Sequence, residues 1–244
     1  MYSFFRLHIY AYHHRGNIEP WMTMSNLNVS KWRPMANGNY DVRVYESGAY
    51  TRFDSSELLE TWTNPVTGQV IEVLPFLGGP LKAEYGPNGL VLPPEREATT
   101  KLLNIEVFGD TVMLATEMNI SHRNPFQPDE WPEKSSGEIM YWDSHYVHFA
   151  SLRELADRSR PSVHTHTQFQ NLVSWQPWHN MGQRPGRTWG RAYGAKIDSF
   201  DQIPAAYRAN LEAQTPEIFD IDNWEDPRDE IQEYMDEMES ERQE

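Results

Sequence analysis

The chain has 244 residues, no cysteine, and a formal net charge of −15 at pH 7. The absence of cysteine excludes disulfides, thiolate nucleophiles and Cys-ligated metals. Residues 215–244 hold thirteen Asp or Glu against two Arg, a net charge of −11, which leaves only −4 for residues 1–214. Because the chain has no cluster of Lys or Arg, the sequence disfavours nucleic acid and anionic membranes as partners.

The first third of the chain predicts antiparallel strands. Residues 4–12 alternate between two sets of side chains with the two-residue period of a half-buried strand. Residues 21–33 and 39–53 are two further strand candidates, joined by Asn37-Gly38, which is a strong hairpin signal. Strand candidates at 58–62 and 70–74 flank the turn Asn64-Pro-Val-Thr-Gly68 and predict a second hairpin.

The middle of the chain continues in the same pattern. Residues 78–98 are rich in Gly and Pro and predict a long loop. Residues 101–108 and 111–120 flank Gly109-Asp110 as a third hairpin, and further strands are predicted at about 138–149 and 162–175. Ser151-Leu-Arg-Glu154 has the form of a capping box and predicts a short helix to about Arg158.

Helices are predicted only towards the C-terminus. Residues 204–213 form one candidate, and Asp226-Pro227 opens another as N-cap and first helical residue. In that last helix the apolar residues make one narrow stripe. Either the helix docks through this stripe on the rest of the chain or on a partner, or the helix frays. The stripe consists of Ile231, Tyr234, Met235 and Met238.

Eight to ten strands joined mainly by hairpins predict a mainly β fold, in which one antiparallel sheet curls into a lipocalin-like or related β-barrel, with short helices in the C-terminal third. A β-sandwich is the alternative. Residues 1–214 are predicted to form a single barrel domain and residues 215–244 an acidic extension. The N-terminus lacks a signal-peptide core and no segment is apolar enough to span a bilayer, so we expect a cytoplasmic protein.

The segment from Trp175 to Gly194 is the strongest pointer to a binding site. It places large rings among prolines and glycines, which are expected to exclude any long regular element. Such rings either shape a ligand pocket or form a packed lid with a purely hydrophobic role. His179 and Arg184 or Arg187 would be nearby polar groups. The candidate ligand-binding residues are Trp62, Trp142, Trp175, Trp178, Met181 and Trp189.

Candidate catalytic residues follow from strand alternation. Glu46 and Tyr50 share one face of a strand; Asn119 lies on one face of another, and His122 lies at its end. If these faces point into a barrel, the lumen holds a carboxylate, a phenol, an amide and an imidazole within aromatic walls, which is typical of a small-molecule pocket. The alternative is that the carboxylates are solvated on the outside. A buried Glu would have a raised pKa and could transfer protons near neutrality.

A second constellation suggests metal chemistry. Asp143, His145 and His148 precede His164 and His166, and imidazole with carboxylate is the usual ligand set of zinc or non-haem iron. Alternation puts His148 on the face opposite to Asp143 and His145, so only pairs of ligands align within a strand. We therefore expect no metal and no other cofactor, with histidines on a polar sheet face or satisfied in the interior.

Three stretches of the sequence resemble the DUF1838 family, a domain of unknown function. They are residues 40–50, residues 59–74 with the Trp62-x-Asn-Pro-x-Thr-Gly68 turn, and Trp175-x-Pro-Trp178 with the residues that follow it, and the resemblance spans roughly residues 15–225. The resemblance supplies no catalytic residues. It implies bacterial and fungal relatives, some beside genes for terpenoid, polyketide or aromatic metabolism, and hence an apolar small-molecule ligand.

Together these observations predict a cofactor-independent cyclase, isomerase or lyase of specialised metabolism that acts on an apolar small molecule. Pericyclic cyclisation of the Diels–Alder type fits best, because it needs shape and one or two hydrogen-bond donors more than a nucleophile. A non-catalytic carrier, a His-dependent metalloenzyme and an adaptor that binds through its acidic helix are the alternatives. A homodimer is compatible with the sequence.

Overall fold

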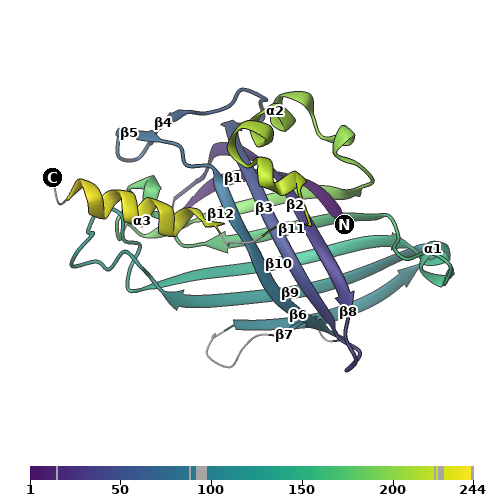
Figure 1. Cartoon of the computed structure of the whole chain (residues 1–244). Helices are drawn as coiled ribbons and strands as arrows, with labels where there is room; N and C mark the ends of the chain where they lie inside the picture. Colours follow the sequence, from purple (N-terminus) through teal and green to yellow (C-terminus); the bar gives the residue numbers. More distant parts are fainter. Residues whose placement is uncertain (15, 88, 92–97, 223, 225–227, 243–244) are drawn as a thin grey trace.

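In the computed structural model, eleven strands form one antiparallel sheet that curls into a half-barrel, and short helices follow near the C-terminus (Figure 1). The structure describes residues 1–14, 16–87, 89–91, 98–222, 224 and 228–242. The prediction of a mainly β, antiparallel, barrel-like fold is confirmed. Within the described residues no ladder joins the β6 side of the sheet to β8, so the barrel is open along one side.

The sheet is built from two consecutive meanders in the order β13-β6-β3-β2-β1-β12-β11-β10-β9-β8, with β7 paired to β6. The ladder between the first and the last long strand, from Tyr2↔Ile197 to His13↔Gly186, joins the two meanders. The first meander contains β1 (Tyr2–His13), β2 (Ile18–Pro34), β3 (Tyr40–Arg52), β6 (Phe76–Gly86) and β7 (Gly89–Val91). The second contains β8 (Ala98–Phe108), β9 (Thr111–Arg123), β10 (Ile139–Ser151), β11 (Thr165–Val173) and β12 (Gly186–Ile197), and β13 (Arg228–Asp229) pairs with β6 at the edge.

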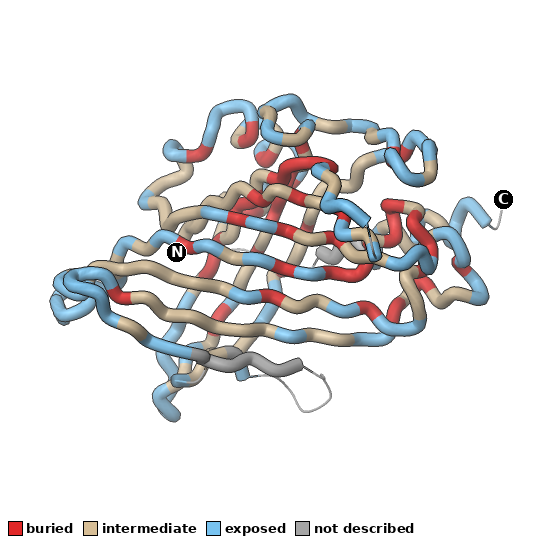
Figure 2. Tube along the Cα trace, turned by 180° about the vertical axis from the view of Figure 1, so that it is seen from behind, coloured by how far each residue is buried: buried red, intermediate tan, exposed pale blue. Residues whose placement is uncertain are grey.

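Along the strands of this sheet, buried residues are interspersed with more exposed ones (Figure 2), and the remaining elements cover parts of the sheet. A separate hairpin of β4 (Thr61–Thr63) and β5 (Val70–Glu72) follows β3, as the sequence predicts for this turn. The α-helices are α1 (Leu152–Ala156), α2 (Ala205–Gln214) and α3 (Glu230–Glu241), and the 3-10 turns are η1 (Pro177–His179), η2 (Phe200–Gln202) and η3 (Pro216–Phe219). None of the helices in the described ranges is both long and apolar enough to cross a bilayer. The predicted Asp226-Pro227 helix start lies outside the described residues.

Two glycine-rich stretches that the sequence assigned to loops are strands. Within the predicted loop 78–98, β6 runs to Gly86, and its irregular register against β3 falls between Val44 and Glu46. At Gly79 φ is +109°, and an added Cβ would collide with the Val44 carbonyl. Glycine is therefore required for this strand to pass β3 at a bulge. Residues 92–97 of the predicted loop lie outside the described residues.

The expectation that residues 175–194 contain no long regular element is also wrong, because β12 covers Gly186–Ile197. The glycines of β12 lie where atoms of the neighbouring strands approach its backbone closely. A Cβ at Gly194 would collide with the Phe4 carbonyl and the Phe5 ring, and one at Gly190 with the Asn171 amide. These glycines mark the close approach of neighbouring strands and not a break in the sheet.

The first half of the C-terminal segment belongs to the core of the domain. The side chains of Tyr207, Ile218 and Trp224 are buried against the convex face of β2 and β3. Tyr45 Oη donates to Glu217 Oε1 at 2.6 Å, and Thr215 Oγ1 donates to Ser47 Oγ at 3.0 Å. The predicted boundary between residues 214 and 215 therefore does not coincide with a break in packing.

The capping box is present, although its helix is shorter than predicted. Ser151 Oγ accepts from the backbone N–H of Glu154 at 3.3 Å, and α1 ends at Ala156. The Glu154 carboxylate accepts from the backbone N–H of His164 at 3.0 Å instead of reaching back to its own N-cap. Ser151 thus caps the helix, whereas Glu154 anchors the loop that leads to β11.

Candidate functional site

The concave face of the sheet carries a group of polar side chains near its centre. Strand register puts Glu46 beside Asn28 on this face, and Tyr146 beside Phe169. Four strands separate β3 from β10 in the sheet, yet after burial the charge of Glu46 is the next largest cause that raises the pKa of Tyr146. The curvature of the sheet therefore brings the two side chains, which share the concave face, within electrostatic reach of each other.

Glu46 has the chemistry of a proton-transfer group. Burial within the half-barrel raises the pKa of its carboxyl, and the hydrogen bond from Asn28 Nδ2 to Glu46 Oε1, at 2.6 Å, partly offsets that rise. The side chain is only half-buried, so a ligand or solvent can still reach it from the open side. A carboxyl group with a raised pKa exchanges protons closer to neutral pH than an exposed one does.

Two phenols lie within electrostatic reach of this carboxyl, and an imidazole packs on one of the phenols. Burial first, and then the charge of Glu46, raises the pKa of both Tyr85 and Tyr146, so both stay protonated at neutral pH and can donate hydrogen bonds. The ring of His148 stacks on that of Tyr146 at 6.3 Å, and burial lowers its pKa. His148 Nδ1 lies 2.9 Å from Thr167 Oγ1. We call Asn28, Glu46, Tyr85, Tyr146 and His148 the polar centre.

The walls around the polar centre are apolar and aromatic. Phe5 and Phe169 meet edge to face at 5.6 Å across the small residues of β12, and Tyr146 packs on Phe169 at 5.2 Å. The register puts a further set of apolar residues on the same face: Met24, Phe76, Leu114 and Met118. Such a surface suits an apolar molecule that carries one or two oxygen atoms.

A cluster of rings closes one end of the concave face. Trp21 stacks on Trp175 at 5.3 Å and packs on Trp62 at 4.8 Å, while Trp178 contacts His179 at 4.3 Å. Only 2% of the surface of Trp175 and of Trp178 is exposed. We call these five residues the tryptophan cluster. It is a packed core that bounds the concave face, which corresponds to the lid alternative for this segment.

The side chain of Asn64 links the two chain segments that supply Trp62 and His179 to the tryptophan cluster. Asn64 is fully buried, and its Oδ1 accepts from the backbone N–H groups of Val66 and Thr67 at 2.8 and 3.2 Å, which shapes the turn after β4. Its Nδ2 donates to the carbonyl of His179 at 2.7 Å. The turn at residues 62–68 and the segment after Trp175 are thus joined by direct contact.

Gly186 is the first residue of β12 and allows the loop before this strand to pack closely against Trp175. Its φ is +141°, and an added Cβ would lie 2.6 Å from the Trp175 ring and 2.8 Å from the Tyr12 carbonyl oxygen. Trp175 Nε1 donates to the carbonyl of Arg184 at 2.8 Å. The loop before β12 is therefore fixed by its glycine and by the ring that it covers.

Two polar atoms inside the cluster lack a hydrogen-bond partner within the described part of the chain. They are Trp21 Nε1 and His179 Nδ1, and their rings meet at 87° and 5.3 Å. Burial lowers the pKa of His179 to about 3, so the imidazole is neutral throughout the physiological range. His179 is a core residue and not the accessible polar group that the sequence suggested.

The burial of His179 predicts a pH dependence of stability. Its pKa of about 3 in the fold lies below the unfolded value of 6.5, so the unfolded state gains the proton first and stability falls as the pH drops below 6.5. Between pH 7.5 and pH 4.5 the wild type should lose about 2.5 kcal/mol more than His179→Phe, in urea unfolding followed by circular dichroism. Equal losses in the two proteins would show that His179 is protonated in the fold.

The structure places two of the four predicted catalytic residues on the concave face. Glu46 and Tyr50 lie on the concave face, where the Tyr50 ring meets Trp178 at 5.3 Å beside the tryptophan cluster. Asn119 is exposed on the convex face, opposite Asp143. His122 is exposed at the end of β9, with Nδ1 3.0 Å from the Arg123 carbonyl. The expectation that Asn119 and His122 complete the same pocket is therefore wrong.

Most of the predicted ligand-binding residues gather at the closed end. Trp62, Trp175, Trp178 and Met181 belong to or touch the tryptophan cluster. Trp142 is half-buried on the concave face and donates from Nε1 to Ser144 Oγ at 2.8 Å. Trp189 lies on the convex face against Tyr10 and Arg191, so its assignment to the same pocket is wrong.

The histidines of the alternative metal site do not converge. Register places Asp143 and His145 on the convex face and His148 on the concave face, as alternation predicts. His164 lies between Glu154 and Asp198, at 3.4 and 3.6 Å, in a surface network. Among the residues that the structure describes, no three His, Asp or Glu side chains are placed to hold a metal ion.

Sequence reasoning missed three residues of the polar centre. Tyr85 lies in a segment predicted to be a loop. Asn28 and Tyr146 lie on the predicted strands at 21–33 and about 138–149, but neither was a candidate site residue. The strand pattern of residues 142–148 could have identified Tyr146. Every second side chain of a strand points to the same face, so Trp142, Tyr146 and His148 lie on one face.

Comparison with known proteins identifies a family but names no activity. No curated protein matches the chain. The family described as a protein of unknown function, DUF1838, matches residues 2–234, which include the whole of β1 and the first part of α3. The match is longer than the stretch of resemblance at residues 15–225, and it includes residues 215–234 of the acidic extension. The chain belongs to the DUF1838 family.

Proposed function

We propose that the chain is a cofactor-independent isomerase or cyclase that binds an apolar, oxygen-bearing small molecule on its concave face and transfers a proton through Glu46. The observation that carries the proposal is the polar centre, in which a carboxyl group of raised pKa faces two protonated phenols within apolar walls. Groups of this kind supply acid–base catalysis and hydrogen bonds to a developing oxyanion.

In this reaction Glu46, the two phenols and Asn28 have separate roles. The Glu46 carboxylate removes a proton from a carbon next to a carbonyl group, and the electron pair moves towards the carbonyl oxygen. A phenol, Tyr85 or Tyr146, donates a hydrogen bond to that oxygen. Where the substrate has a C=C bond next to that carbon, the electron pair is shared over a dienolate, and the protonated Glu46 returns the proton to the far carbon of the C=C bond, which moves the double bond and completes an isomerisation. Asn28 holds the carboxyl in place through its 2.6 Å hydrogen bond.

A Diels–Alder-type cyclisation is the other version of this proposal. It needs a shaped apolar surface and one hydrogen-bond donor, and no proton leaves the substrate. In that case Tyr146 would be the critical group and Glu46 would be dispensable. The raised pKa of Glu46 favours the proton-transfer version, because a carboxyl group without a chemical role would be costly to bury here.

The test is a comparison of Glu46→Gln with Glu117→Gln. Glu117 is a half-exposed carboxylate on the opposite, convex face, so it is the matched control. Apolar ketones and enones are incubated with each protein in D₂O, and NMR follows deuterium exchange and isomerisation. We expect Glu46→Gln to slow the reaction by about 10²- to 10⁴-fold and Glu117→Gln to leave it within about twofold.

The other outcomes separate the alternatives. Turnover that survives in Glu46→Gln but falls in Tyr146→Phe would replace proton transfer by the cyclisation version. Tight binding without turnover by the wild type would make the chain a carrier. Equal rates in all variants would exclude the polar centre as the reaction site.

A further inference from the structure

The convex face carries a groove of its own, away from the polar centre. Two adjoining hollows lie over β1, β12, β11 and β10, with volumes of about 540 and 260 Å³. They share Gln168 and Tyr193 as lining residues, so they lie next to each other, and we call the two hollows together the groove. The small side chain of Ala195 stands between Phe4 and His166 in the register and leaves the larger hollow open.

The two hollows differ in chemistry. The larger one has mainly apolar walls, to which Phe4, Phe149, Ala195 and Ile197 contribute. The smaller one is lined by polar and aromatic side chains, among them His8, Tyr10, Gln170 and Arg191. The groove thus has an apolar end and a polar end, side by side on one rigid sheet.

The charge of this groove is opposite to that of the chain. The chain carries −15 overall, yet neither hollow is lined by Asp or Glu, and Arg6 and Arg191 both line the groove. Arg6 is already close to Asp54, at 3.8 Å. Arg191 lies over the Trp189 ring at 5.2 Å and, within the described part of the chain, forms no ion pair. Its charge is therefore available to a ligand.

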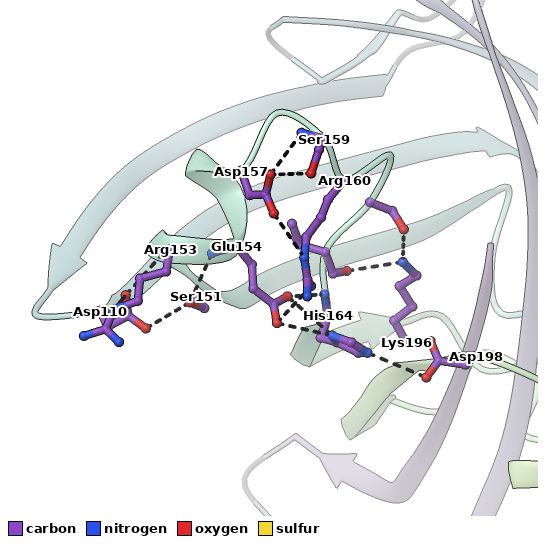
Figure 3. A network of polar contacts seen from close by, with 12 residues as sticks. Asp110, Ser151, Arg153, Glu154, Asp157, Ser159, Arg160, His164, Lys196 and Asp198 are labelled. Atoms are coloured by element: carbon purple, nitrogen blue, oxygen red, sulfur yellow. Dashed lines mark hydrogen bonds and ion pairs between the residues drawn. The ribbon is translucent and has the colours of Figure 1, made fainter.

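One wall of the groove is held by a polar network, shown in Figure 3. His164, two residues before His166, is close to Glu154 and Asp198, and Lys196 donates to Ser162 and to the Val163 carbonyl. These contacts tie the loop before β11 to α1 and to the end of β12, next to His166 and Ile197 in the lining of the larger hollow. A fixed wall reduces the ordering cost of binding.

We propose that this groove binds an amphipathic organic anion. The apolar body lies in the larger hollow against Phe4 and Phe149, and the anionic group lies in the smaller hollow beside Arg191. An arginine beside aromatic rings offers both charge and stacking to such a molecule. The site lies on the opposite face of the sheet from the polar centre, so it does not depend on the proposed reaction.

Two fluorescent probes of similar shape test the proposal. Anilinonaphthalene sulfonate is anionic, and phenylnaphthylamine is its neutral counterpart. We expect saturable binding of the anion, weakened about fivefold or more in Arg191→Gln by loss of the charged contact and lost in Ala195→Trp, which fills the larger hollow. Arg187→Gln is the matched control, because Arg187 lies on the same face of β12 outside the groove and pairs with Asp143 at 3.2 Å. It should bind like the wild type.

Several results would overturn the proposal. Equal affinity for the neutral probe, or equal weakening in Arg187→Gln and Arg191→Gln, would remove the role of the Arg191 charge. Unchanged binding in Ala195→Trp, with loss on Thr116→Trp on the concave face, would place the probe beside the polar centre. Circular dichroism of each variant confirms that it is folded. A dimer in sedimentation that Ala195→Trp dissociates would show that a second copy fills the groove.

Discussion

Replacing Trp175 with alanine is expected to lower the free energy of unfolding by about 3–5 kcal/mol, the usual cost of removing a fully buried large ring. Trp175 is 2% exposed, stacks on Trp21, and donates from Nε1 to the Arg184 carbonyl. Its loss leaves a cavity in the tryptophan cluster and an unpaired carbonyl. Urea unfolding should be followed by far-UV circular dichroism, because the substitution itself changes the tryptophan fluorescence.

Trp189 provides the control within the same sequence segment. It is half-buried on the convex face, so Trp189→Ala should cost no more than about 1.5 kcal/mol, in proportion to the smaller area buried. The sequence alone gave the two tryptophans the same role. Equal losses for the two variants would mean that the tryptophan cluster is not a packed core, and would return Trp175 to the ligand-lining role that the sequence suggested.

Replacing Asn64 with alanine should be nearly as costly, at about 2–4 kcal/mol. The substitution removes the acceptor for two partly buried backbone N–H groups and the donor to the buried His179 carbonyl. Asn104→Ala is the control, because Asn104 is an exposed asparagine on β8 and its loss should change stability by less than about 0.5 kcal/mol. Thermal or urea unfolding measures both.

A second substitution separates the two roles of Asn64. Asn64→Asp keeps the acceptor that shapes the turn but removes the donor to His179, and it buries a carboxyl group. We expect a loss at least as large as in Asn64→Ala. If Asn64→Asp were as stable as the wild type, the contact between the turn and η1 would contribute nothing, and the two motifs would be joined only by packing of their rings.

Much of the fold could be predicted because most strands have one packed face. The alternation in residues 4–12 reflects burial on one side of β1, where Leu7, Ile9 and Ala11 lie, and Asn37-Gly38 connects β2 to β3 as expected. β6 and β12 broke the pattern for a physical reason. Their glycines are positions where a neighbouring strand or side chain approaches too closely for a Cβ, and a single sequence cannot distinguish such a glycine from one in a loop.

The candidate site was predictable within a strand but not between strands. Alternation correctly separated Glu46 from Tyr45, and His148 from His145. Which face of β9 matches which face of β3 depends on the register across β2, β1, β12, β11 and β10, and a shift of one residue in any ladder would exchange the faces. For that reason the sequence assigned Asn119 to the wrong face of the sheet. Tyr146 belongs to the site because the curvature of the sheet brings β10 opposite β3.

The ladder between β1 and β12 also determines when the chain can fold. It pairs residues 2–13 with residues 186–197 at the centre of the sheet, whereas every other long ladder joins strands that are closer in the sequence. During synthesis β1 therefore leaves the ribosome long before its partner, with one edge unpaired. Such non-local pairing slows folding, since a long chain segment must be ordered before the two strands meet. Each meander can begin to form alone, but the half-barrel is completed only when nearly the whole domain has been made.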